Sequence, residues 1–569
     1  MKKLKASDYI ADELHRQGVT VLFEMIGGMI THIIDSVHQK GQIKIISVHH
    51  EQAGGFAAEA VGRMTGIPGV ALATSGPGAT NLVTAIGSCY FDSVPTVFIT
   101  GQVNTTELST GRALRQQGFQ ETDIVSIVQP ITKAAWQLTD AEDLPRMLRA
   151  AFKLAKEGRP GPVLVDLPMN LQRIEIEIPD APDPSPETPA SSEIIEFAHQ
   201  VARAFKSAER PLILAGGGIR SADLHSEFIQ AIETIKAPVA WSLMAIDLLP
   251  FKHPQGVGMI GSYGNRWANQ IMMESDAILV LGSRLDVRQT GADAELFKGN
   301  RPIYHLDCDP EQLNNRVLGC ESCLGDLAEF LPLLTKAFRA EPTTPTSGWF
   351  DRIQALRTQW PDIDELKGCK GINPNDFMHR LSQASVAASA IIADVGKNQM
   401  WAAQSVEIQS GQRFLVSGGM GSMGFALPAA IGSVFASNKP VVCITGDGGL
   451  QCNIQELETI TSHGLPVKII VFNNLSLGMV GQFQEDYFES RMQSTVWGYS
   501  APDFEKVAKA YNINSKTISN PEEVDGAIEW LWSDPKAPAL LNVMIDLDTK
   551  VYPKAAYGRA INDMDPRID

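Results

Sequence analysis

The chain has 569 residues, of which 44% are hydrophobic and 20% charged, which predicts several globular domains rather than one core. The formal net charge of −17 argues against binding to nucleic acid or to an anionic membrane surface. No apolar run approaches the roughly 20 residues of a membrane span, and no apolar signal core follows the basic N-terminus, so we expect a cytoplasmic protein.

Two segments rich in proline and polar residues divide the chain into three blocks. Residues 179–193 and 340–348 suit linkers because such sequences form helices and strands poorly. In each block, short apolar strands alternate with helical stretches, so the predicted fold class is α/β with three doubly wound parallel-sheet domains. The predicted domains are residues 1–178, 194–339 and 349–549, followed by a C-terminal tail or lid at 550–569.

The first block opens with a predicted helix and continues with buried strands. Ser7 is placed to cap an amphipathic helix that Gly18 ends. Apolar runs at 70–74 and 97–100 predict two parallel strands, since a strand buried on both faces is continuously apolar.

Glu51 is the first candidate functional residue. It follows two histidines, and on local sequence alone such a group is most simply a solvated surface cluster. A Gly/Pro turn at 74–81 comes later, in which Thr80 or Asn81 is placed to cap the next helix. The chemical interpretation of Glu51 therefore depends on the motifs in the rest of the chain.

The middle block carries glycines directly after a predicted strand. The strand at 212–215 is followed by Gly216, Gly217 and Gly218, and a further strand is predicted at 277–281. Glycine at such a position lets the phosphates of a dinucleotide approach the backbone. Three glycines alone are a weak signal for such a ligand.

The third block contains a βαβ unit near its centre. Its two strands are predicted at 441–445 and 467–472, and another strand at 391–394. Asn453 and Glu456 have the spacing of a capping box, which predicts that the intervening helix opens at Asn453.

Asp447 and Asn474 follow the two strands of this unit. Parallel strands end at one edge of a sheet, where open α/β sheets bind ligands, so we expect both side chains to converge there. A carboxylate and an amide oxygen suit Mg²⁺, which takes oxygen ligands and commonly carries substrate phosphates. A Gly-Asp-Gly turn alone is most often structural, but its pairing with Asn474 resembles the diphosphate–metal motif of thiamine-diphosphate enzymes.

Taken in order, the motifs of all three blocks resemble the acetohydroxyacid synthase (acetolactate synthase) family over about residues 5–550. The resemblance implies that Glu51 is the glutamate that hydrogen-bonds the aminopyrimidine of thiamine diphosphate and activates that cofactor. A carboxyl group is required there because the ring must change its tautomer to accept a proton. The other residues that the resemblance places at the catalytic centre are Phe119, Gln120 and Lys133.

The resemblance implies three cofactors: thiamine diphosphate, Mg²⁺ and an FAD that is not needed for redox chemistry. A middle domain that keeps the fold without the flavin is the alternative. For thiamine diphosphate the implied residues are Gly27, Gly28, Glu51, Thr74, Asn81, Gly396, Lys397, Asn398, Gly421, Ser422, Met423, Asp447, Gly448, Gly449, Asn474, Ser476, Leu477, Gly478 and Met479. Those for FAD are Gly216, Gly217, Gly218, Ser242, Leu243, Met244, Gly261, Gly264, Gly282, Arg284, Asp286, Arg288 and Asp307. Those for the metal are Asp447, Asn474 and the backbone oxygen of Ser476.

The chain departs from the family pattern near the acceptor substrate and near the cofactor diphosphate. Val287 replaces the second of two aspartates before Arg288, an arginine that in the family helps bind the carboxylate of the second keto acid. Phe483 stands where these synthases usually carry tryptophan, and Lys397 and Asn398 replace the usual Gln-His near the diphosphate. The implied acceptor pocket comprises Arg288, Val480 and Phe483.

The resemblance implies a carboligase that decarboxylates pyruvate and transfers the activated acetyl unit to a second carbonyl, as acetolactate synthase does. The departures leave open acetyl transfer to the keto group of a nucleotide-linked deoxysugar, and a plain 2-keto-acid decarboxylase is a further alternative. An inactive cofactor-binding subunit is another alternative, against which Glu51, Asp447 and Asn474 all count. Because the glutamate and the metal pair belong to different chains in the family, we expect an obligate homodimer or a tetramer.

Overall fold

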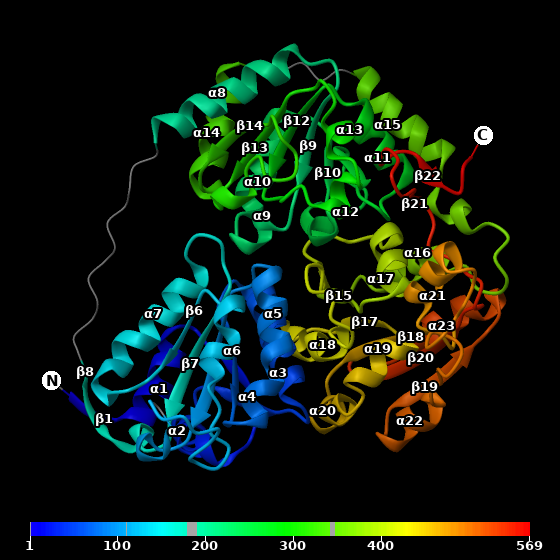
Figure 1. Cartoon of the computed structure of the whole chain (residues 1–569). Helices are drawn as coiled ribbons and strands as arrows, with labels where there is room; N and C mark the ends of the chain where they lie inside the picture. Colours follow the sequence, from blue (N-terminus) through cyan, green and yellow to red (C-terminus); the bar gives the residue numbers. More distant parts are fainter. Residues whose placement is uncertain (1, 110, 179–190, 342–346, 569) are drawn as a thin grey trace.

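The computed structural model describes residues 2–109, 111–178, 191–341 and 347–568. It forms three α/β lobes, with the first and third lobes below the second in Figure 1. Each lobe contains a six-stranded sheet whose neighbouring strands are all parallel, which confirms the predicted fold class. Most of the two predicted linkers, at 179–190 and 342–346, lies outside the described residues.

The first sheet has the strand order β3-β2-β4-β5-β7-β6. Its strands are β2 (Val21–Met25), β3 (Lys44–Ser47), β4 (Gly69–Ala73), β5 (Thr96–Gln102), β6 (Ala134–Gln137) and β7 (Pro162–Pro168). The helices around it are α1 (Ala6–Arg16), α2 (Thr31–Lys40), α3 (Glu51–Thr65), α4 (Pro77–Asn81), α5 (Val83–Phe91), α6 (Ile124–Val128) and α7 (Leu144–Lys156). A separate antiparallel pair joins β1 (Lys2–Lys5) to β8 (Glu175–Ile178).

The second sheet has the order β11-β10-β9-β12-β13-β14. Its strands are β9 (Pro211–Ala215), β10 (Val239–Trp241), β11 (Gly256–Met259), β12 (Ala277–Leu281), β13 (Ile303–Asp307) and β14 (Glu321–Leu324). Its helices are α8 (Ser192–Ser207), α9 (Gly218–Ser221), α10 (His225–Ile235), α11 (Arg266–Glu274), α12 (Val287–Thr290), α13 (Ala294–Lys298) and α14 (Leu327–Ala340). Helix α15 (Ser347–Gln359) packs on α11 and leads to the third lobe.

The third sheet has the order β16-β15-β17-β18-β20-β19. Its strands are β15 (Ala390–Ala393), β16 (Arg413–Val416), β17 (Val441–Gly446), β18 (Val467–Asn473), β19 (Asn514–Ile518) and β20 (Ala539–Met544). Its helices are α16 (Pro374–Ala384), α17 (Lys397–Ser405), α18 (Ala426–Ser437), α19 (Asp447–Cys452), α20 (Glu456–Ser462), α21 (Gly478–Tyr487), α22 (Phe504–Ala510) and α23 (Val524–Leu531). The predicted strands of all three blocks therefore exist, within one or two residues of their expected ends.

Each sheet places two loops side by side where its strand order reverses. In every lobe the chain first adds strands on one side of its starting strand and then crosses to the other side. A crevice forms at such a switch point, outside the carboxyl ends of the strands, and ligands bind there. Glycine keeps the paired loops close: a Cβ on Gly27 would lie 2.4 Å from Thr74, and one on Gly216 would lie 2.1 Å from the Gly282 carbonyl.

The helix caps predicted at Ser7 and Asn453 are wrong. Ser7 lies inside α1, which begins at Ala6, and its hydroxyl accepts a hydrogen bond from Ser36 instead. Asn453 ends α19 rather than opening a helix, because the carboxyl end of β17 passes directly into α19 at Asp447. Its amide donates to the carbonyl of Gly424 and to Gln52 of the first lobe, so the residue joins lobes.

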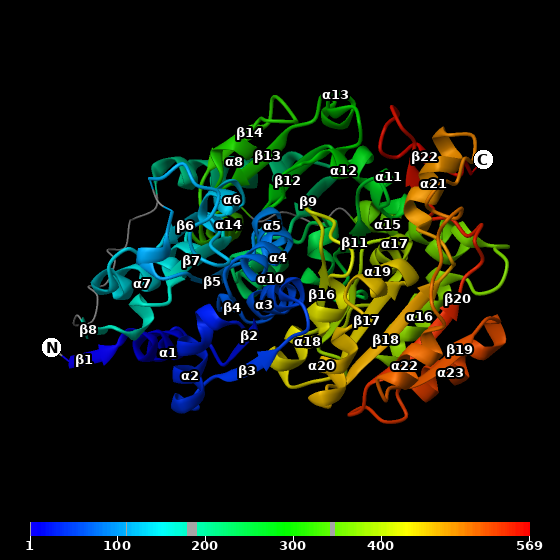
Figure 2. The same cartoon turned by 60° about the horizontal axis from the view of Figure 1, so that its bottom comes forward.

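The first and third lobes are packed through α3 and α18, which lie side by side in both views (Figures 1 and 2). Small residues let their backbones approach: a Cβ on Gly432 would lie 2.1 Å from the carbonyl oxygen of Ala57. Phe56 and Phe425 meet edge to face at the same crossing, with ring centroids 5.4 Å apart. One buried apolar cluster consequently runs through both lobes.

The C-terminal segment lies against the second and third lobes. Its short strands β21 (Lys554–Ala555) and β22 (Met564–Asp565) pair with each other, and the Ala555 N–H donates to the carbonyl of Ser262. Arg266 of α11 donates to the Met564 carbonyl, while Gln482 of α21 exchanges two hydrogen bonds with Val551. None of the helices in the described ranges is both long and apolar enough to cross a lipid bilayer.

His379 of α16 joins two carboxylates near the start of the third lobe. Its Nε2 lies 2.8 Å from Asp362 and its Nδ1 lies 3.1 Å from Glu407. Burial alone would lower the pKa of His379, but the hydrogen bonds and charges of the two carboxylates outweigh it and raise that pKa.

We expect the His379 contacts to stabilise the fold more at low pH than at high pH. Because the folded pKa is raised, the stabilisation is complete below the unfolded value of about 6.5 and is lost as the pH rises through the folded value. At about pH 6 the His379→Gln variant should be less stable by about 1–2 kcal/mol, and the deficit should shrink towards pH 9. Thermal melts of both proteins across this range measure the effect, and a deficit independent of pH would contradict it.

Candidate active site

Four loops of the third lobe converge at the carboxyl edge of its sheet. They follow β15, β16, β17 and β18, and each carries residues that the sequence assigned to thiamine diphosphate or to its metal. A Cβ on Gly448 would lie 2.5 Å from Leu477 and 3.3 Å from Met423, and one on Gly446 would lie 3.2 Å from the Asn398 amide oxygen. The predicted residues of these loops are therefore neighbours in space.

Asp447 sits at the centre of this group as the first residue of α19. The backbone amides of Gly448 and Ser476 donate to its carboxylate, as does the hydroxyl of Tyr499. Burial raises the pKa of Asp447 to about 6, although these hydrogen bonds lower it. Its Oδ2 is buried and has no partner among the described residues, and the same holds for the hydroxyl of Ser476. Buried carboxylate and hydroxyl oxygens that lack a hydrogen-bond partner are suitable ligands for a cation.

Lys397 extends along the same group from the first turn of α17. A Cβ on Gly478 would lie 2.5 Å from the Asn474 amide nitrogen and 3.0 Å from the end of the Lys397 side chain. The ammonium donates to the carbonyl of Thr549 at 2.7 Å. Burial and the nearby charge of Lys550 lower the pKa of Lys397 to about 7. A buried lysine of this kind gains charge stabilisation from any anion that enters the site.

Glu51 begins α3 at the carboxyl edge of the first sheet. The residue is 8% exposed, and its Oε2 accepts a hydrogen bond of 2.9 Å from the amide of Asn81. Asn81 therefore positions Glu51 rather than capping a helix, and Gly76 takes the capping position of α4. Gly78 and Thr74 are also adjacent, since a Cβ on Gly78 would lie 2.9 Å from Thr74 and 3.3 Å from Glu51.

The start of α3 also touches the third lobe of the same chain. The His49 N–H donates to Glu456 at 3.0 Å, and the Asn453 amide donates to Gln52 at 3.2 Å. Glu51 lies between these two contacts in sequence. Its own hydrogen bond to Asn81 stays within the first lobe.

The structure places the remaining predicted catalytic residues in two regions. Gln120 lies beside the Glu51 group, because a Cβ on Gly76 would be 3.0 Å from the Gln120 Cβ. Phe119 next to it is 80% exposed. Lys133 precedes β6, so it lies at the opposite edge of the parallel sheet, where its ammonium donates to the Glu157 carbonyl. The structure thus does not bring Lys133 together with Glu51 within one chain.

The predicted acceptor residues come from two lobes. Val480 and Phe483 lie on α21, both about half exposed, and Phe483 packs on Tyr487 with ring centroids 4.9 Å apart. Met479 on the same helix packs partly into the core. Arg288 lies on α12 of the second lobe, where Asp286 caps the helix by accepting the Arg288 N–H at 2.8 Å. Asp286 also forms an ion pair with Arg284.

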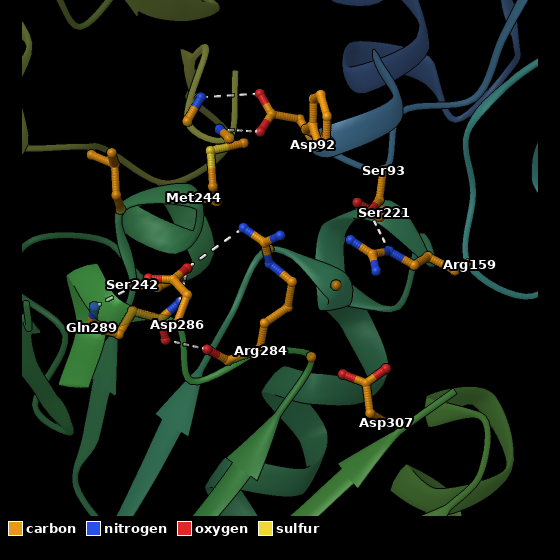
Figure 3. Close-up of a pocket in the computed structure, with 18 of the residues that line it drawn as sticks. Asp92, Ser93, Arg159, Ser221, Ser242, Met244, Arg284, Asp286, Gln289 and Asp307 are labelled. Carbon is orange, nitrogen blue, oxygen red and sulfur yellow. Dashed lines mark hydrogen bonds and ion pairs between the residues drawn. The ribbon is translucent and has the colours of Figure 1, made fainter. Parts of the chain in front are cut away.

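A cavity of about 190 Å³ lies where the three lobes meet. It opens at the switch point of the second sheet, between the loops after β9 and β12 (Figure 3). Most of the residues that the sequence assigned to FAD line it: Gly217, Gly218, Ser242, Leu243, Met244, Gly261, Gly282, Arg284, Asp286, Arg288 and Asp307. Gly216 and Gly264 lie behind this wall, where glycine permits close backbone contacts.

Several polar residues around these sites were missed from the sequence. Asp92, Arg159, Ser221 and Gln289 line the cavity, and Figure 3 shows them on segments of the first and second lobes. Tyr499 donates to Asp447 from a segment with no recognisable motif. Asp92, Arg159 and Tyr499 reach these sites from distant parts of the chain, so a local pattern could not have found them. Ser221 and Gln289 lie close in sequence to residues that were assigned to FAD.

The donor set of the third lobe fits a hydrated divalent cation that carries phosphate. The described residues contain no cluster of three or more His, Cys, Asp and Glu side chains that could hold a metal. A metal site at Asp447 would therefore combine one carboxylate with amide and carbonyl oxygens and would leave coordination positions for phosphate and water, as Mg²⁺ prefers. Glycine in these loops leaves room for such a ligand: a Cβ on Gly421 would meet no atom within 4 Å.

Comparison with known families gives three matches along the chain. Residues 4–127 match the thiamine pyrophosphate enzyme N-terminal TPP binding domain, 198–334 the central domain, and 394–543 the C-terminal TPP binding domain. The chain is 34% identical to the acetolactate synthase isozyme 1 large subunit of Escherichia coli (strain K12), over 99% of this chain and 98% of that protein. It is 36% identical to a probable acetolactate synthase large subunit of Methanocaldococcus jannaschii, over 99% and 95% of the two chains. It is 35% identical to the acetolactate synthase large subunit of Haemophilus influenzae, over 99% and 98%.

Proposed function

Because the chain belongs to the acetolactate synthase family of thiamine pyrophosphate enzymes, we propose that the Glu51 and Asp447 groups are the two halves of its thiamine diphosphate site. The observation that carries this assignment is the orphaned, buried carboxylate oxygen of Asp447 among four converging loops. The same assignment places FAD in the central cavity and Mg²⁺ at Asp447, Asn474 and the Ser476 carbonyl.

The enzyme is a carboligase that decarboxylates pyruvate and transfers the acetyl unit to a second carbonyl. The relatives named above are all acetolactate synthases, which favours a keto acid as acceptor over a nucleotide-linked sugar and over simple decarboxylation. When bound, thiamine diphosphate supplies a nucleophilic carbon that attacks the keto carbon of pyruvate and takes up the electron pair released with CO₂.

Glu51 holds and moves the proton that the chemistry requires. Its carboxyl group would hydrogen-bond a ring nitrogen of the aminopyrimidine, with Asn81 fixing the orientation of the other oxygen. Glu51 is only 8% exposed, so bulk water does not compete strongly for this hydrogen bond. Gln120 lies next to this group and is placed to contact substrate.

The third lobe would hold the charged end of the cofactor. Asp447 and Asn474 would supply oxygens to Mg²⁺, and Lys397 would neutralise diphosphate charge from the first turn of α17. Diphosphate would in turn favour the protonated lysine, whose pKa burial has lowered to about 7. Lys397, which stands where the family usually carries glutamine, is therefore compatible with diphosphate binding.

The cavity assignment predicts that the purified protein contains FAD. Ala222→Trp should weaken flavin binding by at least about 10-fold, because Ala222 lines the cavity and an indole would take up part of its volume. Ala292→Trp is the matched control, since Ala292 is exposed elsewhere in the same lobe. Flavin released from denatured protein, counted per chain, measures the effect. A full complement of FAD in Ala222→Trp would contradict the assignment.

We infer that two chains complete each active site. Apolar side chains near the proposed site are exposed, among them Phe119 at 80%, Val480 at 53% and Phe483 at 52%, and such patches mark protein interfaces. A homodimer in which the Glu51 group of one chain faces the Asp447 group of its partner would cover them. A site formed within one chain is the alternative.

Mixing two inactive variants distinguishes these arrangements. In a Glu51→Gln/Asp447→Asn heterodimer with shared sites, one site carries both defects and the other carries none. Random exchange makes half of the dimers mixed, so about a quarter of wild-type activity should return after co-refolding or co-expression. Activity that stays at the level of the separate variants would show that each site lies within one chain. Sedimentation of the wild type should give a dimer or tetramer.

A further inference from the structure

Asp92 joins the first lobe to the loop that follows β16 in the third lobe. Its two carboxylate oxygens accept the N–H groups of Gly418 at 3.0 Å and Gly419 at 2.7 Å (Figure 3). The Asp92 side chain is 2% exposed, and it forms a 2.7 Å ion pair with Arg63 of α3. Hydrogen bonds from amides to a buried carboxylate are stronger than those between neutral groups.

The same loop, residues 417–424, forms a wall of both proposed sites. At one end, Gly418, Gly419 and Asp92 line the central cavity. At the other end, Gly421, Ser422 and Met423 belong to the proposed thiamine diphosphate site, and Asp394 of the third sheet accepts the Gly424 amide at 2.9 Å. The loop is therefore anchored once beside each site.

Contacts from the first and second lobes leave little freedom at the cavity end of the loop. A Cβ on Gly418 would lie 2.4 Å from the sulfur of Met244, and one on Gly419 would lie 2.8 Å from Phe91. Met244 itself lines the cavity, so a ligand there would press on the residue that confines the loop. If the Gly418 and Gly419 amides moved away from Asp92, the five residues that lead to Met423 would move with them.

We propose that Asp92 is a positioning residue that couples occupancy of the central cavity to thiamine diphosphate binding, by holding the Gly418 and Gly419 amides. The proposal rests on the proposed function, since it takes FAD as the cavity ligand. If FAD and thiamine diphosphate both bind best to the same position of the loop, binding of either one raises the affinity for the other. This coupling is reciprocal.

The test compares thiamine diphosphate binding to full-length enzyme with and without FAD. Calorimetric titration with thiamine diphosphate and Mg²⁺ gives a dissociation constant for each state, and their ratio is the coupling factor. For the wild type we expect tighter binding with FAD by about 5-fold or more, and the same factor for FAD when the order is reversed. In Asp92→Ala the factor should fall to near one while both cofactors still bind.

Glu59→Gln provides a matched control. Glu59 forms an ion pair with the same Arg63 guanidinium from a fully buried position, but the loop amides bond to Asp92. It should keep the wild-type coupling factor. Equal factors in Asp92→Ala and Glu59→Gln would overturn the proposal.

Two further results are decisive. Asp92→Asn serves as a second variant in case the alanine variant does not fold. Asparagine keeps one oxygen acceptor, so the coupling factor should be intermediate. An unchanged coupling factor would overturn the proposal. Binding of both cofactors to the wild type with a factor near one would overturn the coupling alone. If the wild type bound neither cofactor, the proposed function would fail as well.

Discussion

Glu51→Gln is expected to lower kcat for acetolactate formation from pyruvate by about 10²- to 10⁴-fold. Glutamine preserves the size of the side chain and can still bond to Asn81, but it has no acidic proton to share with the aminopyrimidine. The affinity for thiamine diphosphate should change little, because most of the residues assigned to this cofactor lie in the third lobe. Steady-state kinetics and a calorimetric titration measure the two quantities separately.

Glu13→Gln is the control for this variant. Glu13 lies in the same lobe on α1, its side chain is fully buried, and it accepts hydrogen bonds from Tyr9 and Gln17. Its hydrogen-bond partners lie on α1 or at its end rather than in a loop of the site. The Glu13→Gln variant should therefore keep kcat near the wild-type value even if the melting temperature falls. Near-normal turnover in Glu51→Gln would refute the role assigned to this carboxyl group.

Asp447→Asn should weaken binding of thiamine diphosphate with Mg²⁺ by at least about 100-fold. The substitution removes the single carboxylate of the proposed metal site and can direct an amide N–H at the cation. In contrast to Glu51→Gln, the defect should appear mainly as lost affinity, and high concentrations of cofactor and Mg²⁺ should recover part of the activity.

Asp534→Asn controls for the loss of a negative charge in the same lobe. The Asp534 side chain accepts the Lys536 N–H in a turn before β20, away from the converging loops. The affinity of the Asp534→Asn variant for thiamine diphosphate with Mg²⁺ should equal that of the wild type. An Asp447→Asn protein that bound the cofactor normally would move the metal site elsewhere in the chain.

The strands and their loops were predictable because each feature is local. A continuously apolar run marks a strand buried in a parallel sheet, and a glycine or acidic residue directly after it marks a loop at the sheet edge. This is why Asp447, Asn474 and Gly216 could be placed from sequence alone. The family resemblance added Glu51, whose local surroundings are those of an ordinary surface cluster.

Contacts between lobes were not predictable from such patterns. Asn453 has the local spacing of a helix cap, yet its amide is used by Gln52 and Gly424, partners 401 and 29 residues away in the chain. Asp92 follows a helix and would pass for an ordinary C-terminal residue, but two amides of the third lobe bond to it. Tertiary packing decided these positions, and it overrides local propensity.

The glycine-mediated crossing of α3 and α18 bears on how substrate enters. With a backbone oxygen of Ala57 filling the space of a Gly432 side chain, neither helix can slide or tilt without a steric clash. Opening a hinge between the first and third lobes would separate this buried helix pair, so we expect pyruvate to enter by another route. We expect entry and product release to depend instead on segments outside this crossing, and turnover would then respond to changes there more than to changes at the helix crossing.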